Sequence, residues 1–92
     1  MELLREVAEA LEVKQDFLAK KSLTLYLEKE LRDTEAAILK ITSKYGVKSV
    51  LELDDRLKKG NLKEEDMRDD FLELDYLEAK RDKIRRVLEK LQ

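Results

Sequence analysis

Apolar residues recur every three or four positions along nearly the whole chain. From Leu27 to Tyr45 they form one seam in a seven-residue frame, with Thr34 as its only polar member. The same spacing returns between Met67 and Leu91. A seven-residue repeat of this kind is typical of long helices that pack side by side. The pattern therefore predicts two long helices.

Glycine and proline indicate where these helices end. No proline occurs, and the only glycines are Gly46 and Gly60. Gly46 suits the left-handed position that follows a helix end, and Ser49 begins a capping-box pattern with Glu52. After Gly60, Asn61 is a suitable N-cap. We therefore expect a long helix over residues 2–45, a short helix over residues 49–59 and a second long helix over residues 61–91.

The two long segments can be laid antiparallel in one register, with Ile38 against Leu74. In that register the last helix ends opposite Lys20, and residues 1–19 have no neighbouring helix. A continuous helix over these residues would extend roughly 28 Å, at the usual rise of 1.5 Å per residue. The predicted fold class is all-α: a long, coiled-coil-like antiparallel helical hairpin with a short connecting helix, completed by dimerisation.

The first segment carries a broad apolar face that this register leaves uncovered. Burying one large apolar side chain stabilises a protein by roughly 1.5–3 kcal/mol, so the face needs cover. A second copy of the chain or another helical protein can supply it. Alternatively, the helix breaks near residues 20–22 and the first segment folds back as a third helix. The absence of glycine and proline before Tyr45 favours the continuous helix and the homodimer. The predicted interface consists of six residues: Leu3, Leu4, Val7, Leu11, Phe17 and Leu18.

Composition agrees with a single helical domain. The chain has 92 residues, of which 46% are charged, as is typical of long helices. A two-helix hairpin of this size buries little apolar surface, so oligomerisation is an expected source of stability. Cysteine is absent, which excludes a disulfide framework. One Asn and two Gln among many Lys and Glu resemble a thermophile's usage.

Hydropathy and charge restrict the compartment and the partners. No run approaches the roughly 20 apolar residues of a membrane span, and residues 1–5 lack the features of a secretory signal. We therefore expect a cytoplasmic protein without a membrane partner. The net charge of −2 argues against nucleic-acid binding. The bases in residues 80–90 and at residues 20–21 support that function only as an alternative, because bases near a helix end also complement the helix dipole.

Candidate catalytic groups are few. Without His or Cys there is no conventional nucleophilic triad, and zinc sites are nearly excluded. Two isolated glycines form no phosphate-binding loop. Carboxylate pairs at one-turn spacing suit Mg²⁺ or Mn²⁺; they are Glu9 with Glu12, Glu30 with Asp33, Asp66 with Asp69, and Asp70 with Glu73.

The first two of these pairs are similar to the pairs of all-helical nucleotide pyrophosphohydrolases. On one continuous helix, however, they lie about 30 Å apart and cannot share an ion. We therefore predict no catalytic residue, no metal and no cofactor. One alternative is a Mg²⁺- or Mn²⁺-dependent hydrolase of that kind, with carboxylates contributed across a dimer. The other is a structural or assembly protein.

One stretch carries a family resemblance. Residues 44–53 (KYGVKSVLEL), then Gly60, then residues 70–75 (DFLELD) resemble small all-helical archaeal proteins. Some of these are supposed to be antitoxin-like partners of toxins, and many have no assigned function. The resemblance implies a small partner-binding protein and designates no binding residue. The sequence thus predicts a non-enzymatic helical protein–protein interaction module, with an antitoxin-like role as its specific form.

Overall fold

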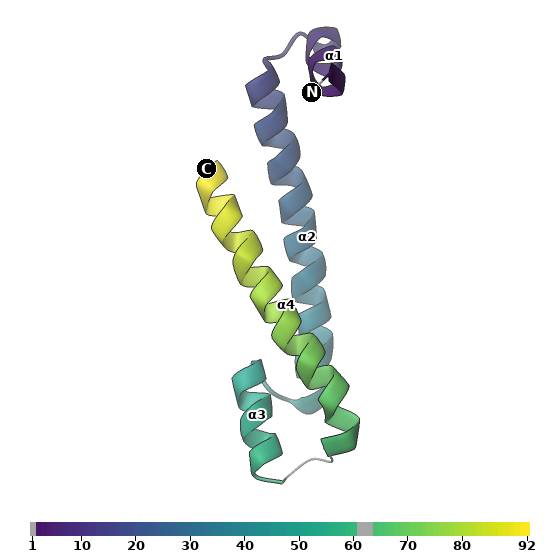
Figure 1. Cartoon of the computed structure of the whole chain (residues 1–92), viewed down its shortest axis with the longest axis vertical. Helices are drawn as coiled ribbons and strands as arrows, with labels where there is room; N and C mark the ends of the chain where they lie inside the picture. The colour runs from purple at the N-terminus through teal and green to yellow at the C-terminus, as the bar shows by residue number, and fades with distance from the viewer. Residues whose placement is uncertain (1, 61–63) are drawn as a thin grey trace.

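The chain folds into a helical hairpin with a short helix at each end. The computed structural model describes residues 2–60 and 64–92, residues 64–66 by their backbone alone. The helices are α1 (Glu2–Leu11), α2 (Gln15–Tyr45), α3 (Val50–Lys58) and α4 (Glu64–Leu91). α2 and α4 run antiparallel, α3 connects them at one end, and α1 lies across the other end of α2 (Figure 1). No strand occurs in the described residues. The predicted all-α antiparallel hairpin with a short connecting helix is confirmed.

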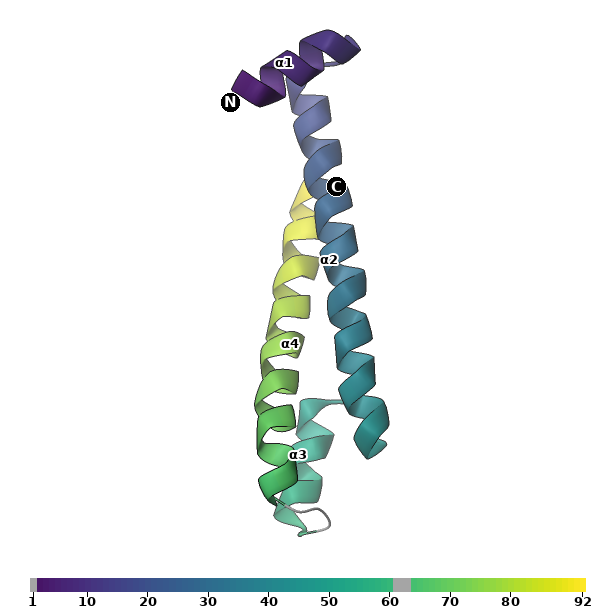
Figure 2. The ribbon, with the colours of Figure 1, turned by 90° about the vertical axis from the view of Figure 1, so that its right-hand side faces the viewer.

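The molecule is a rod. Its principal extents are 60 × 20 × 18 Å, and its radius of gyration is 19.0 Å. A compact chain of this length would have a radius of gyration of about 12 Å. Turned by 90°, the hairpin shows the same narrow outline, with α1 projecting sideways at one end (Figure 2). An elongated fold exposes more surface than a compact one, so more apolar side chains stay in contact with water.

The core lies between α2 and α4 and extends to α3. Ile38 and Leu74 are both buried, as the predicted register requires. Lys80 Nζ lies 3.6 Å from Glu30 Oε1, which joins the two long helices in the same register. The register prediction is confirmed. One cluster of buried residues holds the α3 end of the hairpin together: Ile38, Ile41, Val47, Leu53, Met67, Leu74 and Leu77.

α2 ends at Gly46, as predicted. Gly46 has a φ of 65°, in the left-handed region. The N–H of Val47 donates to the carbonyl of Thr42 at 3.0 Å, and the N–H of Gly46 donates to the carbonyl of Ser43 at 3.4 Å. These two hydrogen bonds define a Schellman motif, which satisfies carbonyls that the helix itself leaves unpaired.

α3 begins with a modified capping box. The Ser49 hydroxyl accepts a hydrogen bond from the N–H of Glu52 at 3.3 Å, as predicted. The Glu52 carboxylate accepts from the N–H of Lys48 at 3.1 Å, one residue before the expected donor. Glu78 of α4 accepts from the N–H of Val50 at 2.8 Å. The N-terminus of α3 is therefore capped by its own residues and also by α4.

Arg56 joins α3 to the end of α2. Its Nη1 donates to the carbonyl of Tyr45, and its Nη2 donates to the carbonyl of Gly46 at 3.0 Å. A cation at this position also complements the partial negative charge of a helix C-terminus. Gly60 follows α3 with a φ of 71°, as its predicted role requires. The predicted N-cap Asn61 lies outside the described residues.

The predicted continuous helix over residues 2–45 is wrong. α1 ends at Leu11 and α2 begins at Gln15. The alternative break near residues 20–22 is wrong as well, because those residues lie inside α2. The real interruption comes earlier in the chain, at residues 12–14.

The interruption is a second Schellman motif, formed without glycine. Glu12 has a φ of 57° and takes the left-handed position. The N–H of Val13 donates to the carbonyl of Ala8 at 3.0 Å, and the N–H of Glu12 donates to the carbonyl of Glu9 at 3.2 Å. A non-glycine residue in this conformation costs roughly 1–2 kcal/mol. The sequence-based prediction failed here because it took the absence of glycine and proline before Tyr45 as favouring a continuous helix.

Candidate protein-binding surface

α1 and the first turns of α2, residues 2–24, form an arm that extends past the end of α4. Ala8 is 1% exposed and packs α1 onto α2. The fold-back is therefore partial, because the larger apolar residues of α1 are not enclosed. Leu3 is 69% exposed and Leu11 is 62% exposed. We call the six residues of the predicted interface the arm surface.

Four of the six line one groove. Leu3, Leu4 and Val7 of α1 face Leu18 of α2, with Ser22 completing the lining. The hollow has a volume of about 240 Å³. The structure thus brings these four predicted residues together between α1 and α2. Leu3 and Val7 remain exposed, while Leu4 and Leu18 are half-buried. The groove is apolar and lies open to solvent.

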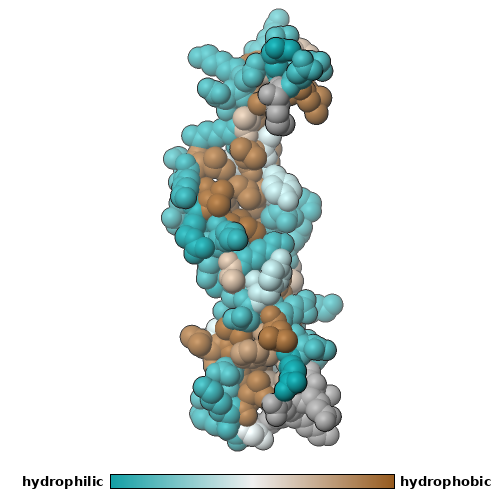
Figure 3. Space-filling view, in the orientation of Figure 1, coloured by the Kyte–Doolittle hydropathy of each residue, from teal (hydrophilic) through white to brown (hydrophobic). Residues whose placement is uncertain are grey.

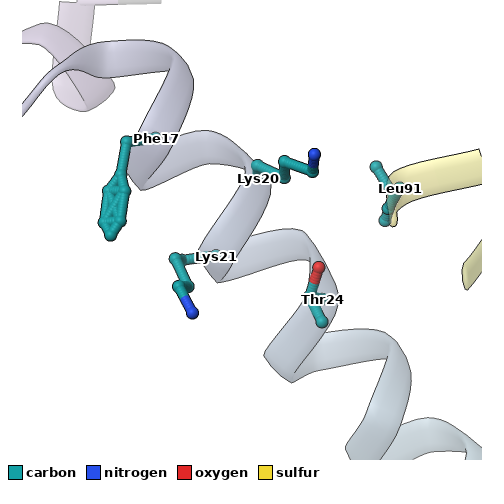
Figure 4. A pocket seen from close by; sticks show the side chains of 5 residues that line it. All are labelled: Phe17, Lys20, Lys21, Thr24 and Leu91. Carbon is teal, nitrogen blue, oxygen red and sulfur yellow. The ribbon is translucent and has the colours of Figure 1, made fainter.

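Phe17 lies in a separate hollow, where α4 ends against α2. This junction hollow is lined by Phe17, Lys20, Lys21, Thr24 and Leu91, and its volume is about 240 Å³ (Figure 4). Phe17 is 48% exposed, and Lys21 Nζ lies 5.8 Å from the centre of its ring. The shared lining by Lys20 and Leu91 agrees with the prediction that the last helix ends opposite Lys20.

The predicted interface leaves out part of the exposed apolar surface. Leu25 is 66% exposed and follows Leu18 along α2 by seven residues. This spacing continues the stripe through Leu4, Leu11 and Leu18, and so the signal was present in the sequence. Figure 3 shows apolar side chains grouped where α4 approaches α2 and again near α3. Further exposed residues of the hairpin are Leu23, Tyr26, Leu39, Leu72, Tyr76 and Val87.

Charges of opposite sign border the two apolar features of the arm. Residues 2–12 contain four acids and one base. The junction hollow is lined by Lys20 and Lys21, and residues 80–90, which end beside it, hold six bases and two acids. Within the described residues, Glu6, Glu9 and Lys20 take part in no ion pair. These charges are therefore free to contact another molecule.

The carboxylate pairs considered for metal binding are engaged elsewhere or stand alone. The hydrogen bond from Lys29 Nζ to Asp33, 2.8 Å long, lowers the pKa of Asp33 and raises the pKa of Lys29. Glu30 contacts Lys80 of α4. Among the described residues, no three acids lie close enough together to hold a metal ion. The side chain of Asp66 lies outside the described residues.

A polar cluster lies at the α3 end of the hairpin. Asp70 accepts hydrogen bonds from Lys44 Nζ at 2.7 Å and from the Tyr45 hydroxyl. The bond from Lys44, followed by that from Tyr45, lowers the pKa of Asp70, and the same contact raises the pKa of Lys44. Burial, together with the carboxylate, raises the pKa of Tyr45. The cluster joins α2 to α4. Arg81 contacts its neighbour Asp82 within α4.

These features define a class: an elongated all-helical protein with a packed hairpin and an exposed apolar arm. No described helix combines the length and the apolar character that crossing a membrane requires. Residues 1–92 match the Uncharacterized protein MJ0235 family, and the chain belongs to that family.

One relative is Uncharacterized protein MJ0235 from Methanocaldococcus jannaschii. The two are 34% identical over 67 residues, which cover 73% of this chain and 80% of the relative. An archaeal relative agrees with the resemblance noted for residues 44–75. No solved structure matches the chain.

Proposed function

We propose that this protein is a non-enzymatic helical protein–protein interaction module that binds its partner through the arm surface. The observation that carries the proposal is the exposure of large apolar side chains on both helices of the arm. Leu3, Leu11 and Phe17 are 69%, 62% and 48% exposed. Covering each such side chain would contribute roughly 1.5 kcal/mol or more. A partner at this position therefore gains several kcal/mol from apolar contact alone.

The total surface supports the same proposal. The chain exposes 7278 Å², whereas a compact monomer of its mass would expose about 5,600 Å². The surplus is roughly 1,700 Å², and a stable interface of standard size covers about 800 Å² on each partner. The rod therefore has enough surface in excess of a compact fold to form such an interface.

An antitoxin-like role is the specific form of this function. The support is the resemblance of residues 44–53 and 70–75 to small helical proteins, some with that supposed role. In this form, the arm surface would cover part of a toxin. The polar contacts at the α3 end, such as that of Arg56 with Tyr45, would hold the hairpin rigid behind it.

Photo-crosslinking tests the proposal. The photoreactive residue p-benzoylphenylalanine is placed at Leu3 in one variant and at Leu51 in a control. Both leucines are exposed, at 69% and 78%, and they lie on α1 and α3, at opposite ends of the rod. The experiment is done on the purified chain and again in the native cells.

The proposal requires a discrete protein adduct from position 3 and little or none from position 51. An adduct with a toxin would support the antitoxin-like form. Equal crosslinking from both positions, or no adduct from position 3 in either setting, would overturn the proposed interaction surface.

A further inference from the structure

The exposed edge of α1 is apolar and bordered by acids. Leu3 and Val7 lie one helical turn apart and are 69% and 39% exposed. Glu6 lies one turn from Leu3 and next to Val7, and Glu9 follows Glu6 by one turn. Glu6 and Glu9 are both exposed. This edge therefore presents two apolar side chains beside unpaired negative charge.

The junction hollow has the opposite character. Phe17 and Leu91 supply apolar surface, and Lys20 and Lys21 line the same hollow. In Figure 4, Lys20 extends from α2 towards the end of α4, while Lys21 lies beside Phe17. The hollow therefore combines two apolar side chains with two exposed bases. These features are suited to an apolar segment that carries acids.

Within one chain, α1 does not occupy this hollow. α1 lies over the side of α2 that carries Leu18 and Ser22. These residues follow Phe17 and Lys21 by one position, which places them about 100° further round the helix axis. The acid-bordered edge and the base-lined hollow therefore lie on different sides of the same arm. A second molecule is needed to bring two such features together.

We propose that the partner at the arm surface is a second copy of this chain, with the α1 edge of each copy seated in the junction hollow of the other. This inference rests on the proposed function. The contact is self-complementary, as a two-fold dimer requires, because each copy supplies one edge and one hollow. Opposite charges then meet at both contacts. The surplus exposed area is large enough for each copy to contribute a standard interface.

The first measurement is the mass of the full chain in solution. Sedimentation equilibrium from about 5 to 500 µM should show association towards twice the 10.9 kDa of one chain. Raising the salt from about 0.05 M to 0.5 M should weaken the association several-fold, because exposed charges are screened. A mass of one chain at every concentration overturns the inference.

Charge reversal tests the arrangement. One variant combines Glu6→Lys with Glu9→Lys, and the other combines Lys20→Glu with Lys21→Glu. Each variant alone should dimerise at least about tenfold more weakly than the native chain, because like charges then meet at both contacts. An equimolar mixture should recover the native affinity as a heterodimer, since both of its contacts again pair opposite charges. The recovery also shows that both variants fold.

Lys40→Glu is the matched control, because Lys40 is an exposed base of α2 outside the arm. It should leave the dimer unchanged. A dimer that resists both double reversals, or a mixture that does not recover, overturns the proposed contact. If the chain stays monomeric but position 3 crosslinks to a different protein, the second-copy inference fails and the proposed function stands. If position 3 yields no adduct, the proposed function fails too.

Discussion

One Schellman motif lies just before α2 and another directly follows it, but the surroundings of the two motifs differ. At the α3 end, the left-handed residue is Gly46, and Arg56 donates to its carbonyl. At the arm, the left-handed residue is Glu12, at the turn between α1 and α2. The α3 end encloses Leu53 and Leu74, both 0% exposed, whereas the largest enclosed residue of α1 is an alanine.

This difference separates a closed core at one end of the chain from an apolar surface left open at the other. At the α3 end, the apolar cluster around Leu53 and Leu74 is buried, although Leu51 and Leu72 remain exposed. Within the described residues, no buried side-chain polar atom lacks a hydrogen-bond partner. The arm uses the same residue types but leaves them uncovered. A region with apolar side chains in excess of its own contacts is the region where a partner contributes most.

The largest expected loss of stability follows from a substitution in the closed core at the α3 end. Leu53→Ala should lower the free energy of unfolding by about 2–5 kcal/mol, because it removes a side chain that is 0% exposed from a closed core. Urea unfolding followed by circular dichroism measures the change.

The control for this change is Leu51→Ala in the same helix. Leu51 is 78% exposed, so its truncation should change the free energy of unfolding by no more than about 0.5 kcal/mol. Equal losses in the two variants would show that the α3 end is not the closed core described here.

An intermediate effect on stability is expected from substitutions at the two residues with a left-handed backbone conformation, Gly46 and Glu12. Gly46→Ala should destabilise the chain by about 1–2 kcal/mol, because a side chain is strained at a φ of 65°. A Cβ at Gly46 would have no neighbour closer than Arg56 Nη1 at 3.8 Å, so the loss arises from the backbone. Thermal unfolding at fixed protein concentration measures it.

The converse change, Glu12→Gly, relieves strain at a φ of 57° but increases the entropy of the unfolded chain. We expect no loss of stability and a gain below about 1 kcal/mol. A large destabilisation from Glu12→Gly would mean that the Glu12 side chain itself holds the arm in place.

The smallest expected loss of stability concerns the polar cluster. Asp70→Asn should cost about 1 kcal/mol at neutral pH, because it removes the charged acceptor of Lys44, whose own side chain is largely exposed. The pKa of Asp70 is lowered in the folded chain. The stabilisation that the Asp70 carboxylate provides is therefore complete above its pKa in the unfolded chain, near 4. This stabilisation disappears as the pH falls from there through the lower pKa of the folded chain.

Urea unfolding of both proteins across this pH range measures the difference between them. The gap should be constant from about pH 5 to 7 and should close below about pH 4. A gap that persists in acid would show that the loss comes from packing and not from the charge.

Much of the hairpin was predictable because its signals are local. The seam from Leu27 to Tyr45 established α2 and its register against α4. Gly46 and Ser49 established the turn and the start of α3. The contact of Arg56 with the end of α2 was not predictable, because it joins residues ten and eleven positions apart through a turn geometry that only the fold supplies. The hydrogen bond of Glu78 was not predictable either, because Glu78 caps α3 from another helix.

The sequence identified the apolar residues of the arm but not the direction that α1 takes. The six residues chosen for the interface are exposed or half-buried, yet four of them line a groove, Phe17 lines a separate hollow and Leu11 lines neither. The reason is the turn at Glu12, which redirects α1. A glutamate in the left-handed conformation has no distinctive sequence signal, since its stabilisation comes from backbone hydrogen bonds and from the burial of Ala8.

The length of the rod determines how many neighbours it can have at once. α3 and the arm lie at opposite ends of a molecule 60 Å long. A small protein seated on α1 would therefore leave the α3 end of the rod uncovered. The two ends of the molecule are separate surfaces, and contact at one does not obstruct the other.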